Sequence, residues 1–143
     1  MMSVPINYWA VLVAAVVNMV LGSLWFGPVF GKKWAASAGM KMPSQMTAAE
    51  KKAMNFSYFM MFVGSLLMAL ILARAIFLSS AYLLAGGAAV GMWTGLIAWI
   101  GFVAPVTWGV VLWDKKTWTY WAYTYLYYLL GFVVMGAILG AWM

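Results

Sequence analysis

Four long apolar runs, separated by short polar segments, account for nearly the whole chain. They predict helices at about residues 6–27, 48–77, 84–112 and 118–142. A helix of roughly 20 residues crosses a hydrocarbon core of about 30 Å, and each run is long enough to do so. The pattern therefore predicts an all-α, polytopic membrane protein, a bundle of four transmembrane helices.

Local signals define where these helices begin and end. Pro28 cannot continue a helix without losing a hydrogen bond, so it should end the first one. Residues 28–47 are rich in Gly, Pro, Ser, Lys and Met and are expected to form a loop. Thr47 and Glu50 have the spacing of a capping box, which predicts a helix start at Ala48. The third helix should be kinked at Pro105 or lose its regular geometry there.

The second helix is expected to end near Phe77, with a turn at Ser79 and Ser80. Arg74 would then lie three residues from the outer end of this helix. Its long side chain could reach the headgroups from there, and an outer-interface contact with an anion or a lipid phosphate is the alternative.

Basic residues are distributed unequally between the two sides of the predicted bundle. Arg74 is near one side, whereas seven lysines flank the helices on the other: Lys32, Lys33, Lys41, Lys51, Lys52, Lys115 and Lys116. Lysine-rich loops remain in the cytosol. We therefore expect the 28–47 loop to be cytosolic and both termini to lie outside. The net charge of +6 is explained as a topology signal, and nucleic-acid binding is not expected.

The composition excludes most enzyme classes. The chain is 68% hydrophobic and 7% charged, and it has neither cysteine nor histidine. Its only carboxylates, Glu50 and Asp114, are far apart in sequence. Acid–base, thiol and zinc chemistry therefore lack candidate groups. We therefore expect no enzyme activity and no cofactor. We also expect no metal, because gap-filling packing explains the 13 methionines better than a copper site does.

An aromatic segment begins the fourth helix with the sequence "WTYWAYTYLYYLLG", residues 118–131. Trp118 can lie in the interfacial belt, but Tyr127 and Tyr128 follow after about 15 Å of helical rise and are too deep. Buried tyrosine hydroxyls require hydrogen-bond partners. The deep tyrosines should therefore face another helix, or else a wet cavity.

Polar and aromatic residues of all four helices fall at a similar estimated depth. An amide in hydrocarbon must be hydrogen-bonded or hydrated. Asn18 could simply tie helices together, or it could belong to a small polar site. The candidate solute-lining residues are Asn18, Ser65, Trp99, Tyr125 and Tyr128.

Glycines recur at intervals of four in the third and fourth helices. Small residues at this spacing allow close approach of helix backbones. We expect one stripe to pack within the chain and the other to serve a homo-oligomer. The stripes consist of Gly87, Gly91 and Gly95, and of Gly136 and Gly140.

Three blocks, "LWFGPVFGKKW" (24–34), "WIGFVAP" (99–105) and "VMGAILGAW" (134–142), resemble the domain-of-unknown-function 1761 family of small bacterial membrane proteins. The resemblance implies four helices and a bacterial inner-membrane location, and it supplies no activity. In the first block, the helix end and its tryptophans and lysines suggest an anchor at the inner interface. These residues are Trp25, Pro28, Lys32, Lys33 and Trp34.

Two functional hypotheses follow. The first is a homo-oligomer that binds a small solute or lets it pass, without proton coupling, because no carboxylate is embedded in a predicted span. The second is a non-catalytic scaffold or accessory subunit that docks on another membrane protein. Membrane lipids are expected partners in both cases.

Overall fold

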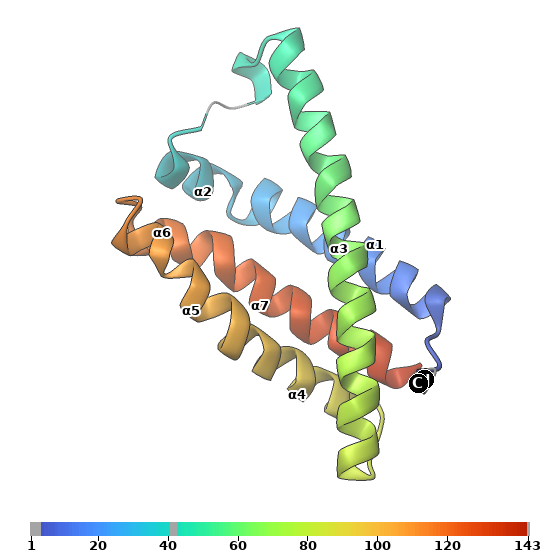
Figure 1. Cartoon of the computed structure of the whole chain (residues 1–143). Coiled ribbons are helices and arrows are strands. Elements are labelled where there is room, and N and C mark those ends of the chain that lie inside the picture. The colour runs from blue at the N-terminus through green and yellow to red at the C-terminus, as the bar shows by residue number, and fades with distance from the viewer. Residues whose placement is uncertain (1–3, 41–42, 143) are drawn as a thin grey trace.

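The computed structural model describes residues 4–40 and 43–142, and all of the regular secondary structure in these residues is helical (Figure 1). Four of its helical segments are long and apolar enough to cross a membrane, which confirms the predicted four-helix membrane architecture. The elements are α1 (Tyr8–Leu24), η1 (Trp25–Val29), α2 (Gly31–Ala38), η2 (Pro43–Gln45), α3 (Ala48–Leu83), α4 (Ala88–Ala98), η3 (Trp99–Val103), α5 (Ala104–Thr107), α6 (Gly109–Leu112) and α7 (Trp118–Ala141).

The first span consists of α1 and a π-helical turn, η1. Asn7 begins α1, because its side chain accepts hydrogen bonds from the N–H groups of Trp9 and Ala10. The helical backbone is interrupted at Gly27, just before Pro28, where φ −104° and ψ −107° are not helical and the chain is kinked, as the proline predicted. Across this kink the N–H of Phe30 donates to the carbonyl of Trp25, five residues earlier.

The expected 28–47 loop is partly helical, which corrects the prediction. After η1, the chain forms α2, and Gly39 ends this helix in the left-handed conformation at φ 68°. Glycine adopts this conformation without a steric penalty. The lysines and alanines of "GKKWAASA" favour a helix. The helix was not predicted because eight residues are too few to show a clear apolar periodicity.

α3 is longer than predicted at one end. The capping box at its start is confirmed, because Thr47 Oγ1 accepts from Glu50 N–H and the Glu50 carboxylate accepts from Thr47 N–H. The serines at 79 and 80 do not form a turn, and the helix continues to Leu83. Arg74, which is exposed, therefore lies nine residues before the helix end instead of three.

The third span starts later than predicted and is divided by Pro105. Gly87, at φ 92°, lies in the turn that precedes α4, so the helix begins at Ala88. Pro105 has no N–H for the carbonyl of Gly101. The preceding turn widens into η3, where Ala104 N–H donates to Trp99 O. The predicted irregularity is therefore a π-helical turn followed by two short helices, α5 and α6.

α4 and α7 pack backbone to backbone through the predicted glycines. A Cβ at Gly91 would overlap the carbonyl of Gly136, and one at Gly136 would overlap the carbonyl of Gly91. Gly140 meets Gly87 in the same way, and Gly95 meets the carbonyl of Phe132. The two glycine stripes therefore pack against each other within one chain. The expectation that one stripe serves contact between copies is wrong for this arrangement.

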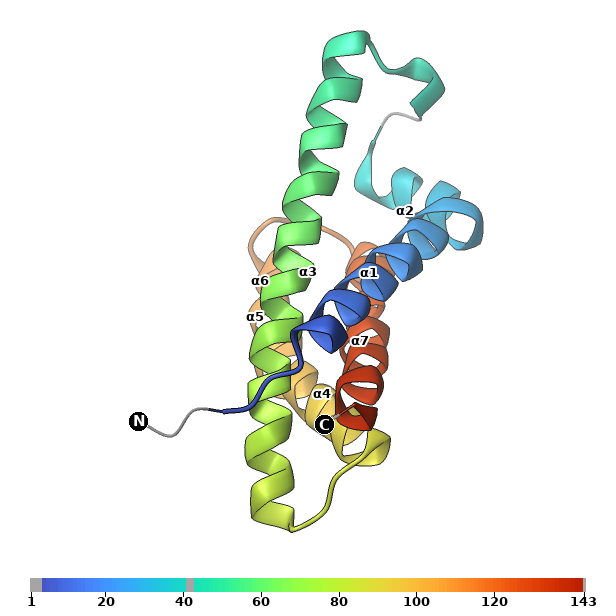
Figure 2. The same ribbon diagram turned by 90° about the vertical axis from the view of Figure 1, so that its right-hand side faces the viewer.

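The apolar core lies where α1, α3 and α7 meet. Ala14, Ala69, Ile76 and Met135 are completely buried there. α3 crosses α1 at a large angle and then diverges from it, as the upper half of Figure 1 and the view in Figure 2 both show. On that side of the crossing, residues of α1–η1 and of the first half of α3 line two adjoining hollows, and we call this opening the wedge.

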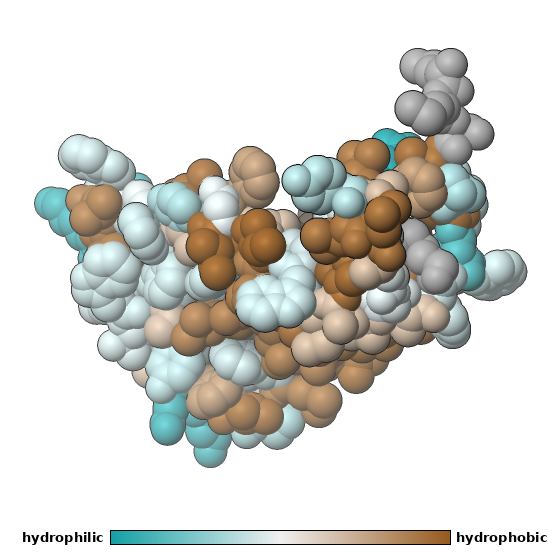
Figure 3. Space-filling view, turned by 90° about the horizontal axis from the view of Figure 1, so that it is seen from below, coloured by the Kyte–Doolittle hydropathy of each residue, from teal (hydrophilic) through white to brown (hydrophobic). Residues whose placement is uncertain are grey.

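The wedge opens toward the end of the bundle that carries the lysines. Lys32 and Lys33 lie in α2, Lys51 and Lys52 in the first turn of α3, and Lys115 and Lys116 just before α7. Lys41 lies outside the described residues. α1 begins and α7 ends at the opposite end of the bundle (Figure 1). Seen from below, the surface is a mixture of brown, white and pale blue, and saturated teal is confined to a few edges (Figure 3).

Candidate functional site

A buried polar junction joins three helices at the base of the wedge. Asn18 of α1 donates from Nδ2 to Ser65 Oγ of α3 at 2.8 Å. The Tyr127 hydroxyl of α7 donates to the backbone carbonyl of Asn18 at 2.9 Å. Asn18 and Ser65 are both completely buried. The junction therefore closes the bundle at this depth.

One acceptor of the junction has no conventional donor. Asn18 Oδ1 is buried and accepts no hydrogen bond from the described residues. It lies against Gly131 of α7, where a Cβ would overlap it. Cα–H groups form weak hydrogen bonds with oxygen at helix–helix contacts. Gly131 thus leaves room for the amide.

A cavity of about 170 Å³ lies in the wedge directly above this junction. Gly22 makes room for the phenol of Tyr127, which forms part of the cavity wall, because a Cβ at Gly22 would lie 2.9 Å from the hydroxyl oxygen. The wall residues come from α1–η1, α3 and α7: Met19, Gly22, Ser23, Phe26, Gly27, Tyr58, Met61 and Tyr127.

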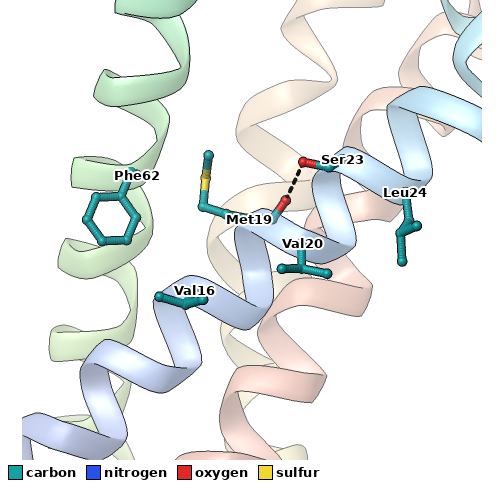
Figure 4. A pocket seen from close by; sticks show the side chains of 6 residues that line it. All are labelled: Val16, Met19, Val20, Ser23, Leu24 and Phe62. Atoms are coloured by element: carbon teal, nitrogen blue, oxygen red, sulfur yellow. Dashed lines mark hydrogen bonds between the residues drawn. The ribbon is translucent and has the colours of Figure 1, made fainter.

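A larger and more open groove of about 400 Å³ adjoins the cavity. Figure 4 shows Phe62 of α3 opposite Met19 and Ser23 of α1, and these two α1 residues line both hollows. Val16, Val20 and Leu24 complete an almost entirely apolar wall. The Ser23 hydroxyl donates to the carbonyl of Met19, as the dashed line in Figure 4 shows. The wedge is therefore open at the surface of the molecule along its side.

The five predicted solute-lining residues do not form one site. Asn18 and Ser65 lie below the cavity and contact each other instead of lining it. Trp99, Tyr125 and Tyr128 lie on the other side of α7. Trp99 is buried and donates from Nε1 to the carbonyl of Tyr125 at 3.1 Å. None of the five lines either of the two hollows.

Aromatic packing explains most of the aromatic segment at the start of α7. Tyr125 stacks on Tyr128 with a ring distance of 6.2 Å, and Tyr128 contacts Tyr127 at 5.0 Å. Tyr127 in turn meets Phe26 of η1 edge-on at 5.1 Å. Tyr125 and Tyr128 therefore serve as packing residues, whereas Tyr127 also forms part of the cavity wall.

The residues predicted to anchor the inner interface divide into two groups. Trp25 and Trp34 turn toward α7, where their indole N–H groups donate to the Tyr123 carbonyl at 2.7 Å and to Thr124 Oγ1 at 3.1 Å. The other three, Pro28, Lys32 and Lys33, are exposed at the lysine-bearing end. The two tryptophans therefore fix η1 and α2 against α7 instead of pointing outward.

Sequence reasoning missed most of the cavity wall. Met19, Ser23 and Phe26 have helical spacing, but an apolar stripe of this kind is typical of packing surfaces in general. Tyr58 follows Ser57 and begins a run of phenylalanine and methionine residues, and no motif distinguishes it. The cavity exists because two helices diverge, and a one-dimensional pattern does not contain a crossing angle.

The polar groups at this site are hydroxyls and backbone carbonyls. Among the residues that the structure describes, no three His, Cys, Asp or Glu side chains gather as metal ligands would. Hydroxyls exchange hydrogen bonds without carrying charge at neutral pH. The geometry is therefore that of a binding site with an apolar body and a weakly polar margin.

Comparison with known proteins identifies a family for this chain. Neither the curated proteins nor the solved structures include one that matches the chain. A family model described as "Protein of unknown function (DUF1761)" matches residues 9–140, which include all four spans. The chain therefore belongs to the domain-of-unknown-function 1761 family, as the three sequence blocks predicted.

Proposed function

We propose that this protein binds an amphipathic molecule taken up sideways from the bilayer, with the apolar part of the ligand in the wedge between α1 and α3. The observation that carries the proposal is the cavity of about 170 Å³ above the Asn18–Ser65 pair. Its size is close to that of an engineered apolar cavity of about 150 Å³ that admits a benzene-sized molecule. The adjoining groove would extend the space for a longer alkyl chain.

The closed junction favours binding over permeation. Asn18 and Ser65 hydrogen-bond directly, with no exposed surface on either side chain. A water-filled path at this depth would be expected to hydrate these groups. We therefore expect proteoliposomes that contain the protein to pass small solutes such as glycerol no faster than empty liposomes.

The composition of the wall favours a ligand with a small polar group. Methionine and phenylalanine side chains supply adaptable apolar contacts. The hydroxyls of Tyr58 and Tyr127 are the polar side-chain groups that α3 and α7 contribute to the cavity wall. Few polar groups in a mostly apolar hollow are typical of small-molecule sites.

Photolabelling with azioctanol, an eight-carbon alcohol that carries a diazirine, tests the proposal. The purified protein in detergent is irradiated at increasing azioctanol concentrations, and the labelled residues are mapped by mass spectrometry. We expect saturable labelling at Met61 and Tyr127, on the cavity wall. Leu67 is exposed on α3 beyond the crossing, so its labelling should rise only linearly, as ordinary partitioning requires.

Two serines provide a matched pair of variants. Ser23 lines both hollows, whereas Ser57 lines neither, and each is exposed and donates to the carbonyl four residues earlier in its helix. Ser23→Phe should fill the wedge and remove the saturable labelling, while Ser57→Phe should preserve it. Equal labelling of both variants, or labelling that never saturates, would contradict the proposal.

An accessory role is the second candidate function, favoured by the first half of α3. Phe56, Phe59 and Met60 have the i, i+3, i+4 spacing of one helix face, and all three are exposed. We expect such a subunit to co-purify with another membrane protein in fixed stoichiometry, and Phe59→Ala to release it while Leu67→Ala does not. A monodisperse chain with no stoichiometric companion would favour the binding role alone.

A further inference from the structure

A graded series of polar residues runs up one face of α3. Ser65, Tyr58, Asn55 and Lys51 are spaced so that they project within about 40° of a common direction at roughly 100° per residue. Ser65 contacts Asn18 of α1, so this face is the one that α3 turns toward α1. Phe62 interrupts the series just beyond the crossing. From Tyr58 onward, the polarity of this face increases from a phenol to an ammonium group at the lysine-bearing end.

This face forms one wall of the wedge. Tyr58 and Met61 line the cavity and Phe62 lines the open groove. Lys51 is exposed and lies seven residues before Tyr58, which corresponds to about 10 Å along the helix axis at roughly 1.5 Å per residue. Lys51 therefore lies on the wedge side of α3, between the cavity and the lysine-bearing end.

The other charges near the mouth are mostly positive. Lys52 follows Lys51 but projects about 100° away from the wedge face. Lys32 and Lys33 are exposed on α2, at the same end of the bundle. The carboxylate of Glu50 accepts a hydrogen bond from the N–H of Thr47 at 2.7 Å in the capping box. An acidic headgroup at the mouth would thus meet a net positive field.

We propose that the ligand of the wedge is an anionic phospholipid of the surrounding bilayer. One acyl chain lies in the groove between α1 and α3, and the headgroup phosphate pairs with Lys51. This inference rests on the proposed function, because it names the ligand class for the same wedge. Charge complementarity at the mouth and an apolar groove below it together match the two ends of such a lipid.

Native mass spectrometry of the full-length protein tests the ligand class. The protein is equilibrated in detergent with phosphatidylglycerol or with phosphatidylcholine that carries the same oleoyl chains, and the bound fraction is titrated. We expect tighter binding of phosphatidylglycerol. Lys51→Gln should weaken phosphatidylglycerol binding about fivefold, the factor that corresponds to ~1 kcal/mol per lysine at an anionic surface. Phosphatidylcholine binding should weaken less, because the choline ammonium offsets the charge of its phosphate.

Lys52→Gln is the matched control, because it removes the same charge from the adjacent residue on a different face. It should preserve the preference for phosphatidylglycerol, and helical circular dichroism should show that both variants fold. If both variants lose the same affinity for phosphatidylglycerol, the effect is a general attraction of anionic lipid and the headgroup assignment is overturned. Equal affinity of the native chain for the two lipids would also overturn that assignment.

The outcome separates this inference from the proposed function. If Ser23→Phe removes saturable azioctanol labelling but Lys51→Gln changes no lipid affinity, the wedge binds an apolar group and the anionic ligand class is wrong. If azioctanol labelling does not saturate in the native chain, the proposed function fails, and the inference fails with it.

Discussion

At the scale of single residues, Asn18 determines how closely three helices pack. Its side chain bonds Ser65, its carbonyl accepts from Tyr127, and its Oδ1 lies against Gly131. The sequence predicted that Asn18 must find a partner, because an unpaired amide is costly in hydrocarbon. It did not identify Gly131, since a lone glycine in an apolar helix is no signal for a contact with an amide.

Gly131→Ala should destabilise the protein by about 1–3 kcal/mol. The added methyl group would overlap Asn18 Oδ1, and the amide can move only by weakening its bond to Ser65. Thermal unfolding in detergent, followed by circular dichroism, measures the change. Gly64→Ala is the control, because a Cβ at Gly64 has no neighbour within 4 Å. Similar melting temperatures for the two variants would show that the contact with Asn18 is unimportant.

At the scale of helices, the apolar runs and the local signals predicted most of the chain correctly. Thr47 and Glu50 give the start of α3, and Pro105 gives the irregular part of the third span. The continuation of α3 through Ser79 and Ser80 was missed because serine is only moderately unfavourable in a helix. The sequence also could not pair the glycine stripes, because helical spacing identifies a face but not the face that meets it.

Gly91→Ala should separate α4 from α7 and lower stability by about 1–3 kcal/mol. A Cβ at Gly91 meets the backbone of Gly136, which cannot rotate away as a side chain can. The same unfolding experiment measures the loss, with Gly101→Ala as a control in the same span that has open space around its Cα. A variant of unchanged stability that loses only an oligomer would show that the stripe joins copies of the chain.

At the scale of the whole molecule, the lysines and the wedge lie at the same end. The charge pattern predicts that this end is cytosolic and that both termini are outside. Alkaline phosphatase fused after the last residue should then be active in intact bacterial cells, and green fluorescent protein at the same position should be dark. The opposite result would place the mouth of the wedge in the outer leaflet and reverse the predicted orientation.

The wedge itself is a property of the assembled molecule. Each wall is an ordinary helix, and the space between them arises because α3 crosses α1 at the Asn18–Ser65 pair and then diverges. Four spans, their polar residues and the lysine-bearing end could be predicted from the sequence. The divergence could not, because it depends on how side chains of α1, α3 and α7 fit together.

Methionine-methyl NMR tests the central claim, ligand binding in the wedge, most directly. Met19 and Met61 line the cavity, Met92 is exposed on α4, and Met135 is completely buried in the core. In deuterated detergent, added octanol should shift the Met19 and Met61 methyl signals along a saturating curve. The Met92 signal should change only in proportion to octanol, and the Met135 signal should not move. Proportional shifts of Met19, Met61 and Met92 alike, without saturation, would contradict a binding site in the wedge.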